Sequence, residues 1–256
     1  DYFSAIGVDR ISEEMRAFIA GHGIGTETIA GIEGRSPGLY MIHLKDGERS
    51  FSYWRSASAA RLLARDGDRL RAAMDASDLI VFSGITLAIL PPEDVETLLA
   101  ELRRAKATGK RIAFDPNIRP RLWDDAARMR DTITEGARAA TLVMPSLDDE
   151  TTHFGDAGLE ETIARYRALG VAHLVVKDGA EGATLVFGEE SSHAPSAKVE
   201  TIVDTTSAGD SFNGAFLARL ATGASPQDAA RFAANVAAAV IQHHGALVVR
   251  DKLPEA

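Results

Sequence analysis

The sequence predicts an α/β fold in which a mostly parallel central sheet is flanked by helices. Short runs rich in β-branched and aromatic residues alternate with longer amphipathic runs, and turn residues separate them. Such alternation favours parallel pairing, because a helix between two strands returns the chain to the same end of the sheet. The 256 residues are 45% hydrophobic, so we expect residues 1–256 to form one large domain.

The first strand of this sheet is expected at residues 78–84, an apolar run that reads as buried. Two prolines followed by two acids, residues 91–94, then start a helix. The face of that helix that is predicted to be buried comprises Val95, Leu98, Leu99 and Leu102. Further strands are expected at 110–115, 142–144, 173–177 and 183–187, the last helices at roughly 208–221 and 226–242, and the longest loop at 145–158.

One segment departs from this alternation. Residues 38–44 and 48–55 read as a β-hairpin with Asp46-Gly47 at its turn. In the second of these strands the period of two puts Phe51, Tyr53 and Arg55 on one face and Ser52 and Trp54 on the other. Placing an arginine on an aromatic face costs free energy unless its guanidinium group contacts an anion or a water-filled cleft. The alternative is an edge strand whose arginine reaches water.

Composition excludes several classes of function. The net charge of −9, without a dense Lys/Arg run, argues against a general nucleic-acid surface. The sequence contains no cysteine, which excludes disulfides and thiolate zinc sites. It contains no uninterrupted apolar run of spanning length and opens on Asp1-Tyr2-Phe3 rather than on a secretory leader. We therefore expect a cytoplasmic protein that binds small molecules and neither nucleic acid nor membrane.

Residues 204–212, Asp-Thr-Thr-Ser-Ala-Gly-Asp-Ser-Phe, lead directly into an apolar helical pattern. Small residues at the start of a helix leave backbone N–H groups bare, and these groups together with the helix dipole attract anions. Asp210 stands at the same point, where it is placed to take a proton from a substrate. The commoner role of an aspartate in a first turn is that of a cap or dipole partner.

This segment resembles the signature of the ribokinase-like (PfkB) carbohydrate kinases, whose usual form is Asp-Thr-x-Gly-Ala-Gly-Asp. Ser207 stands where the first glycine is usual, which affects loop geometry more than the reaction. The resemblance runs from Ile6-Gly7 to the C-terminus and implies a ribokinase-like fold in which hairpin 38–55 forms a small β lid. The sequence begins at what resembles a second or third strand of the family, so the family's first strand and its Gly-Gly-x-x-x-Asn sugar-binding segment are not in it.

The resemblance implies that a phosphoryl group passes from ATP, with Mg²⁺, to a sugar hydroxyl. Asp210 would be the base, and backbone N–H groups would hold the phosphoryl charge. The residues implied in this catalytic role are Ser207, Ala208, Gly209 and Asp210.

Three further segments are implied in nucleotide binding. Asp115-Pro-Asn117-Ile-Arg119 follows a strand, where ligands bind in open α/β sheets, although a turn with a solvated arginine reads equally well. Turn 177–182 would lie under the nucleotide and helix 232–238 beside the adenine, although alanines there more simply indicate close helix packing. The residues implied in these segments are Asn117, Arg119, Lys177, Gly179, Gly182 and Asn235, and Ser146 of segment 146–150 is implied in nucleotide binding as well.

Residues 146–150, Ser-Leu-Asp-Asp-Glu, resemble the family's Asn-x-x-Glu motif, whose carboxylate helps to hold magnesium. Both key positions differ here, as Ser146 and Asp149. Asp149 is the implied magnesium residue, although Asp148 and Glu150 also offer oxygen ligands. The alternative is a helix cap followed by acids in the first turn.

The run Gly38-Leu-Tyr40 and the run Phe-Ser-Tyr-Trp-Arg at 51–55 resemble those of 2-keto-3-deoxygluconate kinases in particular. That acceptor carries a carboxylate, which a guanidinium group binds through two parallel hydrogen bonds. The alternatives are a related kinase for fructose, ribose or a nucleoside, or a regulator that binds sugar or nucleotide without turnover. A lid hairpin can also pair with that of a second copy, which makes a homo-oligomer compatible with the sequence. The implied substrate-binding residues are Tyr40, Tyr53, Trp54, Arg55, Arg119 and Asp210.

Overall fold

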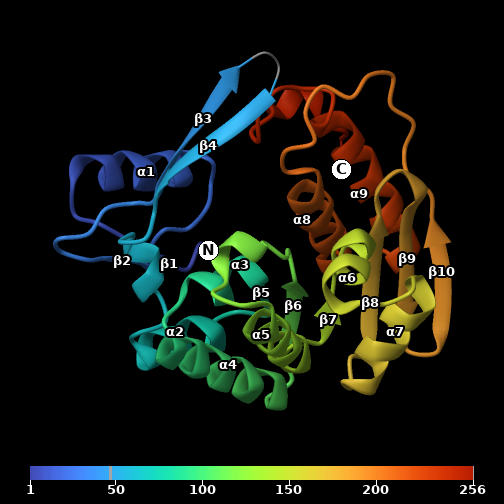
Figure 1. Cartoon of the computed structure of the whole chain (residues 1–256), viewed down its shortest axis with the longest axis horizontal. Helices are drawn as coiled ribbons and strands as arrows, with labels where there is room; N and C mark the ends of the chain where they lie inside the picture. Colours follow the sequence, from blue (N-terminus) through green and yellow to red (C-terminus); the bar gives the residue numbers. More distant parts are fainter. Residues whose placement is uncertain (46–47, 256) are drawn as a thin grey trace. The chain divides into compact units, whose positions relative to one another are not determined.

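The computed structural model describes residues 1–45 and 48–255, and it has the α/β class that the sequence predicts (Figure 1). The chain divides into two compact units. The first comprises residues 1–80, 85–111 and 121–123, and the second comprises residues 81–84, 112–120 and 124–256. A single domain over residues 1–256 stays a prediction.

The first unit contains two small sheets. β1 (Ser4–Ile6) and β2 (Ile29–Gly31) pair in parallel across α1 (Arg10–Gly21), whose N-cap Asp9 accepts a hydrogen bond from the Ser12 N–H. β3 (Leu39–Lys45) and β4 (Glu48–Trp54) form the predicted antiparallel hairpin. The predicted turn at Asp46-Gly47 lies outside the described residues.

The helix that the two prolines predict is α4 (Pro92–Ala107), and its expected face is buried. It packs against α2 (Gly67–Asp75). A short 3-10 helix spans Ala59–Leu62, and α3 spans Gly84–Ile89.

A six-stranded sheet runs in the order β10-β9-β8-β7-β6-β5. β6, β7 and β8 pair in parallel, whereas β8, β9 and β10 pair in antiparallel fashion, so the sheet is mixed. Its strands are β5 (Leu79–Ser83), β6 (Arg111–Asp115), β7 (Leu142–Val143), β8 (His173–Asp178), β9 (Gly182–Phe187) and β10 (Glu190–Ala194). β10 was not among the strands predicted from the sequence.

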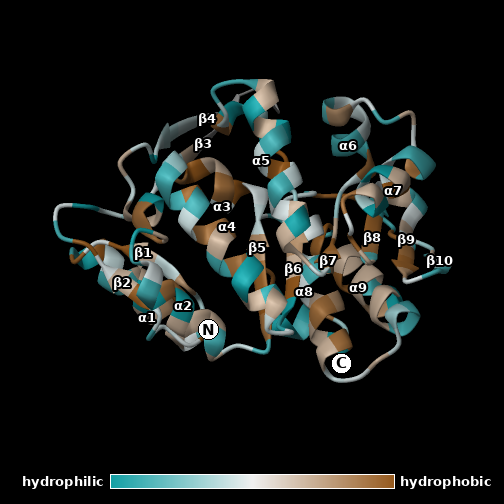
Figure 2. Ribbon diagram, turned by 90° about the horizontal axis from the view of Figure 1, so that it is seen from below, coloured by the Kyte–Doolittle hydropathy of each residue, from teal (hydrophilic) through white to brown (hydrophobic). Residues whose placement is uncertain are grey.

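Helices cover both faces of β8 and β9 in the second unit. Figure 2 shows α6 (Leu147–Phe154) and α7 (Leu159–Ala168) on one side of these strands and α8 (Ala208–Ala221) and α9 (Pro226–Val240) on the other. The strands between them are largely buried, which explains their apolar runs. The second unit also contains α5 (Ala126–Ala139).

Two expectations are wrong. β5 is not a buried strand, because only one of its faces is covered: Phe82 stacks on Phe114 with ring centroids 4.5 Å apart, whereas Val81 is 58% exposed. Segment 145–158 is not a long loop, because its middle forms α6. Acids in the first turn of α6 favour the helix dipole, and Gly155 ends the helix with a φ of 80°.

Within the described residues, no helix combines the length and the hydrophobicity that crossing a bilayer requires.

Candidate active site

The N-terminal end of α8 has the geometry of an anion site. Ser207 precedes the helix in a left-handed conformation, with φ 61° and ψ 15°. The Ala208 N–H donates to the Thr205 carbonyl at 3.2 Å, and the Ser211 N–H donates to the Ser207 carbonyl at 2.9 Å. The N–H groups of Gly209 and Asp210 take no acceptor from the described residues, and both residues are exposed. These two donors are therefore available to an anion.

The buried carboxylate of Asp204 shapes the loop that leads into this end. Its Oδ1 accepts from the Thr206 N–H at 2.9 Å and from the Thr206 hydroxyl at 2.6 Å. Its Oδ2 accepts from the Gly245 N–H at 2.9 Å. Asp204 thus joins the loop before α8 to the segment that follows α9, a role that sequence analysis did not assign.

A cluster of three polar side chains lies beside the same helix end. Lys177 at the end of β8 donates from Nζ to Asn213 Oδ1 at 3.1 Å and pairs with Asp115 Oδ1 at 3.4 Å. Asn213 of α8 donates from Nδ2 to Asp115 Oδ2 at 2.7 Å. A Cβ at Gly209 would lie 3.8 Å from Lys177 Nζ, so the ammonium group is next to the start of α8. Sequence analysis assigned Lys177 to nucleotide binding and placed Asp115 in segment 115–119 without a role of its own, and it missed Asn213.

Two of the predicted nucleotide residues are tied to this cluster. Asn117, at the end of β6, has a φ of 36°, and its N–H donates to Asp115 Oδ1 at 3.2 Å. Ser146 forms a parallel bridge with Lys177, and the Lys177 N–H donates to the Pro145 carbonyl at 2.9 Å. The ends of β6, β7 and β8 therefore bring Asn117, Ser146 and Lys177 into one region.

Arg119 and Asp149 lie close to each other. Burial raises the pKa of the Asp149 carboxyl, while the charges of Arg119 and His153 and the Ile118 N–H act to lower it. Arg119 is exposed, and its Nη1 donates to the Ile118 carbonyl at 2.8 Å. The described residues contain no group of three or more acids or histidines that would form a metal site made of protein ligands alone.

Glu150 has a structural role rather than a ligand role. Its side chain is fully buried, with Oε2 accepting from Arg165 Nη2 at 2.5 Å and Oε1 accepting from the Tyr166 hydroxyl at 3.0 Å. Burial raises the pKa of Glu150 to about 7 against the effect of the Arg165 charge. Both carboxylate oxygens are engaged with α7, so the expectation that Glu150 offers a cation ligand is wrong. Asp148 and Asp149 remain as the candidate carboxylate ligands of a cation in this segment.

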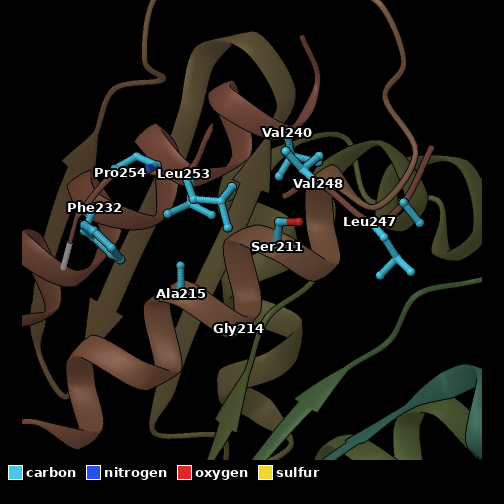
Figure 3. A pocket seen from close by; sticks show the side chains of 11 residues that line it. Ser211, Gly214, Ala215, Phe232, Val240, Leu247, Val248, Leu253 and Pro254 are labelled. Carbon is cyan, nitrogen blue, oxygen red and sulfur yellow. The ribbon is translucent and has the colours of Figure 1, made fainter. Parts of the chain in front are cut away.

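An apolar groove of about 400 Å³ lies between α8, α9 and the segment after α9. Ser211 and Ala215 of α8 and Phe232 of α9 contribute to its walls, and Leu247, Val248 and Leu253 line it from the C-terminal segment (Figure 3). The helix predicted to lie beside the adenine thus lines a groove. Asn235 is exposed and does not belong to the lining.

The glycines of turn 177–182 have conformational reasons to be there. Gly179 and Gly182 both have positive φ, at 49° and 106°. A Cβ at Gly182 would stand 2.2 Å from the Ala194 carbonyl oxygen, so the close approach of β10 requires glycine there. No atom lies within 4 Å of a Cβ built on Gly179.

In the first unit, the hairpin carries the predicted lid residues. Tyr40 and Tyr53 are opposite each other in the register, with ring centroids 6.3 Å apart. The Arg55 guanidinium lies 4.2 Å from the centroid of the Tyr53 ring, which confirms that these two side chains share a face. Trp54 is 57% exposed.

Comparison with known proteins assigns the family. Residues 1–252 match the pfkB family carbohydrate kinases. The chain is 36% identical to a 2-dehydro-3-deoxygluconokinase from Dickeya dadantii, in an alignment that covers 99% of this chain and 84% of that protein. A PfkB protein from Polaromonas sp. JS666 superposes with a TM-score of 0.82 and 26% identity, over 92% of this chain and 77% of that one. A protein from Escherichia coli assigned as a ribokinase II, solved with ATP and Mg²⁺, gives a TM-score of 0.83 and 25% identity, over 95% of this chain and 77% of that one. The chain therefore belongs to the pfkB family of carbohydrate kinases.

Proposed function

We propose that this kinase transfers the γ-phosphoryl group of ATP to 2-keto-3-deoxygluconate and forms 2-keto-3-deoxy-6-phosphogluconate. The observation that carries the proposal is the start of α8, where two N–H groups without an acceptor among the described residues accompany the exposed carboxylate of Asp210. The name of the Dickeya dadantii relative, which denotes a kinase for this sugar acid, supports the choice of acceptor.

Asp210 is the proposed base. Its carboxylate takes the proton of the acceptor hydroxyl as that oxygen bonds to the γ-phosphorus. The bond between this phosphorus and the β–γ bridging oxygen breaks, and ADP leaves with the electron pair. Negative charge on the moving phosphoryl group faces the N–H donors of Gly209 and Asp210, beside Ser207 and Ala208. Because these donors are fixed by the helix, they need little reorganisation during the reaction.

The apolar groove of the second unit is the proposed adenine site. Its walls suit a flat apolar ring, with Phe232 on one side and Leu253 in the C-terminal segment. The phosphates would extend from there toward the ends of β6, β7 and β8. The residues proposed to contact the nucleotide are Asn117, Arg119, Ser146, Lys177, Gly179, Gly182 and Asn235.

The donor set fits magnesium of the kind that is held mainly by phosphates and water. Mg²⁺ retains several waters and commonly takes only one or two protein carboxylates. Asp149 is half-buried near Arg119, and it is the carboxylate that we propose for this role. When bound, the ion neutralises phosphate charge.

Arg55 and Arg119 are the proposed partners of the acceptor carboxylate. A guanidinium that already lies against the Tyr53 ring loses less side-chain freedom when it binds a carboxylate. Tyr40, Tyr53 and Trp54 would contact the sugar from the hairpin, the tyrosines through their hydroxyl groups.

The test measures ADP release by the purified protein with ATP and Mg²⁺. We expect turnover of 2-keto-3-deoxygluconate to exceed that of fructose, ribose and adenosine. Arg55→Ala should lower kcat/KM for the sugar acid about 10- to 100-fold, the effect of losing one charged hydrogen bond. Neutral sugars should change by less than about twofold, and Arg10→Ala, which removes an exposed arginine from α1, should change neither.

Efficient turnover of a neutral sugar, with equal losses for all acceptors in Arg55→Ala, would instead favour a fructose, ribose or nucleoside kinase. If ATP binds but no acceptor turns over, the chain is a regulator and the proposal is wrong.

A further inference from the structure

We propose that Lys177 binds the γ-phosphoryl group of ATP at the start of α8, where Asp115 and Asn213 hold its ammonium group in position. This inference rests on the proposed function in that the bound anion is a nucleoside triphosphate. It assigns Lys177 to the transferred group rather than to the nucleotide in general. It also gives Asp115 and Asn213 a role as positioning residues.

In the part of the chain that the structure describes, the hydrogen bonds of the Lys177 ammonium group leave one of its donors for a ligand. An ammonium group has three N–H donors. One points to Asn213 Oδ1 at 3.1 Å and another to Asp115 Oδ1 at 3.4 Å. Nζ also lies 3.8 Å from where a Cβ of Gly209 would be, beside the two N–H groups of α8 for which no acceptor is found among the described residues. The third donor and those N–H groups are therefore close enough to bind the same phosphoryl oxygens.

Asp115 is arranged as a support rather than as a competitor for the cation. Its Oδ1 accepts from the Asn117 N–H and from Lys177, and its Oδ2 accepts from Asn213 Nδ2 at 2.7 Å. Asp115 is the last residue of β6, and these donors come from the turn that follows it, from β8 and from α8, so a single carboxylate joins three elements around one point. The Asp115 and Lys177 side chains are only 14% and 15% exposed, so water weakens their pairing little.

Gly209, at the start of α8, leaves room for the ammonium group of Lys177. A methyl group there would stand in van der Waals contact with Lys177 Nζ and cover the face of the ammonium that adjoins the helix. In a helix, alanine is ordinarily more stable than glycine by about 1 kcal/mol. Glycine at this position is therefore consistent with access to Lys177 rather than with helix stability.

The deciding experiment compares ATP with ADP by calorimetry, with Mg²⁺ and without any sugar. Lys177→Met removes the charge and keeps a long apolar stem. We expect it to weaken ATP binding about 10- to 100-fold, the loss of one charge-assisted hydrogen bond, and ADP binding by less than about threefold. Lys198→Met, which removes an exposed lysine before α8, is the matched control and should change neither affinity.

A second pair of variants separates binding from folding, since Lys177→Met leaves Asp115 without its cation. Asp115→Asn removes the carboxylate charge, and the double variant Asp115→Asn/Lys177→Met removes both charges. If the double variant melts within a few degrees of Asp115→Asn but binds ATP at least tenfold more weakly, with ADP binding unchanged, the loss is due to Lys177. Equal weakening of ATP and ADP, or no weakening of either, overturns the proposal.

These results are distinct from a failure of the proposed function. If no sugar acid is phosphorylated but Lys177→Met still discriminates ATP from ADP, the acceptor assignment is wrong and the role of Lys177 stands. If 2-keto-3-deoxygluconate is phosphorylated but Lys177→Met leaves ATP affinity and kcat unchanged, the acceptor assignment stands and the proposed role of Lys177 is wrong.

Discussion

Ser207 adopts a backbone conformation that L-residues other than asparagine and aspartate seldom adopt. Its φ is 61°, and its side chain makes no capping hydrogen bond to α8, so the hydroxyl does not offset the strain. We expect Ser207→Gly to raise the free energy of unfolding by about 0.5–1 kcal/mol, with kcat within about twofold. Ser191→Gly, in strand β10, is the control and should lower stability. Denaturant titration of the two variants measures both effects, and a loss of stability in Ser207→Gly would contradict the assigned strain.

Asp210 provides the most direct test of the chemistry. Asp210→Asn keeps the shape of the side chain and the N–H donors of the helix but removes the base. We expect kcat to fall about 10²- to 10⁴-fold, the range of general base catalysis, with ATP affinity within about threefold of the unchanged protein. Steady-state kinetics and calorimetry on the same preparation separate the two quantities. Unchanged turnover would show that Asp210 is only a dipole partner of α8.

For individual residues, the sequence predicts site residues that are neighbours along the chain, but it does not predict which distant residues folding brings together. Ser207 to Asp210 form a local motif, so their shared location could be predicted. Asp115 and Asn213 are 98 positions apart, and Asp115 and Lys177 are 62 apart. Lys177 was assigned to nucleotide binding and Asp115 was seen only as the start of segment 115–119, while Asn213 looks like an ordinary helix residue on its own. Their meeting depends on the strand order of the sheet, which one sequence does not determine.

Among the elements, α2 and α4 are joined by a buried carboxylate with two arginine partners. Glu101 of α4 accepts from Arg71 Nη2 and from Arg104 Nε, both at 2.6 Å. The hydrogen bond from Arg71 contributes most to lowering the pKa of Glu101 to about 2. The charged form is therefore favoured by folding, and its contribution is present above the unfolded pKa of about 4.3 and lost as the pH falls toward 2.

Glu101→Gln should accordingly lower stability by about 2 kcal/mol at pH 7, where a charged hydrogen-bonded group is lost. The difference from the unchanged protein should shrink between pH 4 and pH 2, because the carboxylate becomes protonated in that range. Glu14→Gln, in an exposed i,i+4 pair on α1, should have no measurable effect at either pH. Denaturant unfolding across this pH range checks the prediction, and a difference that is constant with pH would refute the assigned cause.

The helices and strands that were predicted correctly have recognisable patterns within their own sequence. α4 has a proline start and an apolar face of helical period, and β6 is a short apolar run before polar residues. The segment of α6 was expected within a long loop because its residues are mostly polar, while a helix cap followed by acids was the alternative. The structure confirms the alternative, with Ser146 at the N-cap and acids in the first turn. The Glu150–Arg165 pair also joins α6 to α7. β10 was missed because four of its five residues are exposed, so it lacks the alternation that marks a strand. Local signals therefore favour α6, whereas β10 depends on its pairing with β9.

For the whole molecule, the proposed ligands divide between the two units. The second unit contains the groove, the start of α8 and the Lys177 cluster, which are the proposed nucleotide contacts. The first contains the hairpin with Arg55 and Tyr53, which are proposed contacts of the sugar acid. If this division is correct, nucleotide and acceptor should protect different amides from hydrogen exchange, because a ligand slows the opening of the segments that it contacts.

Hydrogen exchange with mass-spectrometric readout tests that division. With ADP and Mg²⁺ alone, we expect slower exchange at residues 205–212 and 245–254 and little change at 39–45 and 48–54. Adding 2-keto-3-deoxygluconate should then slow exchange in the two hairpin strands, and Arg55→Ala should remove that second effect while leaving the first. Ribose, which lacks a carboxylate, is the control acceptor and should protect the hairpin less at the same concentration. Protection of the hairpin by nucleotide alone, to the extent seen with the acid, would mean that Arg55 responds to phosphate rather than to the sugar carboxylate.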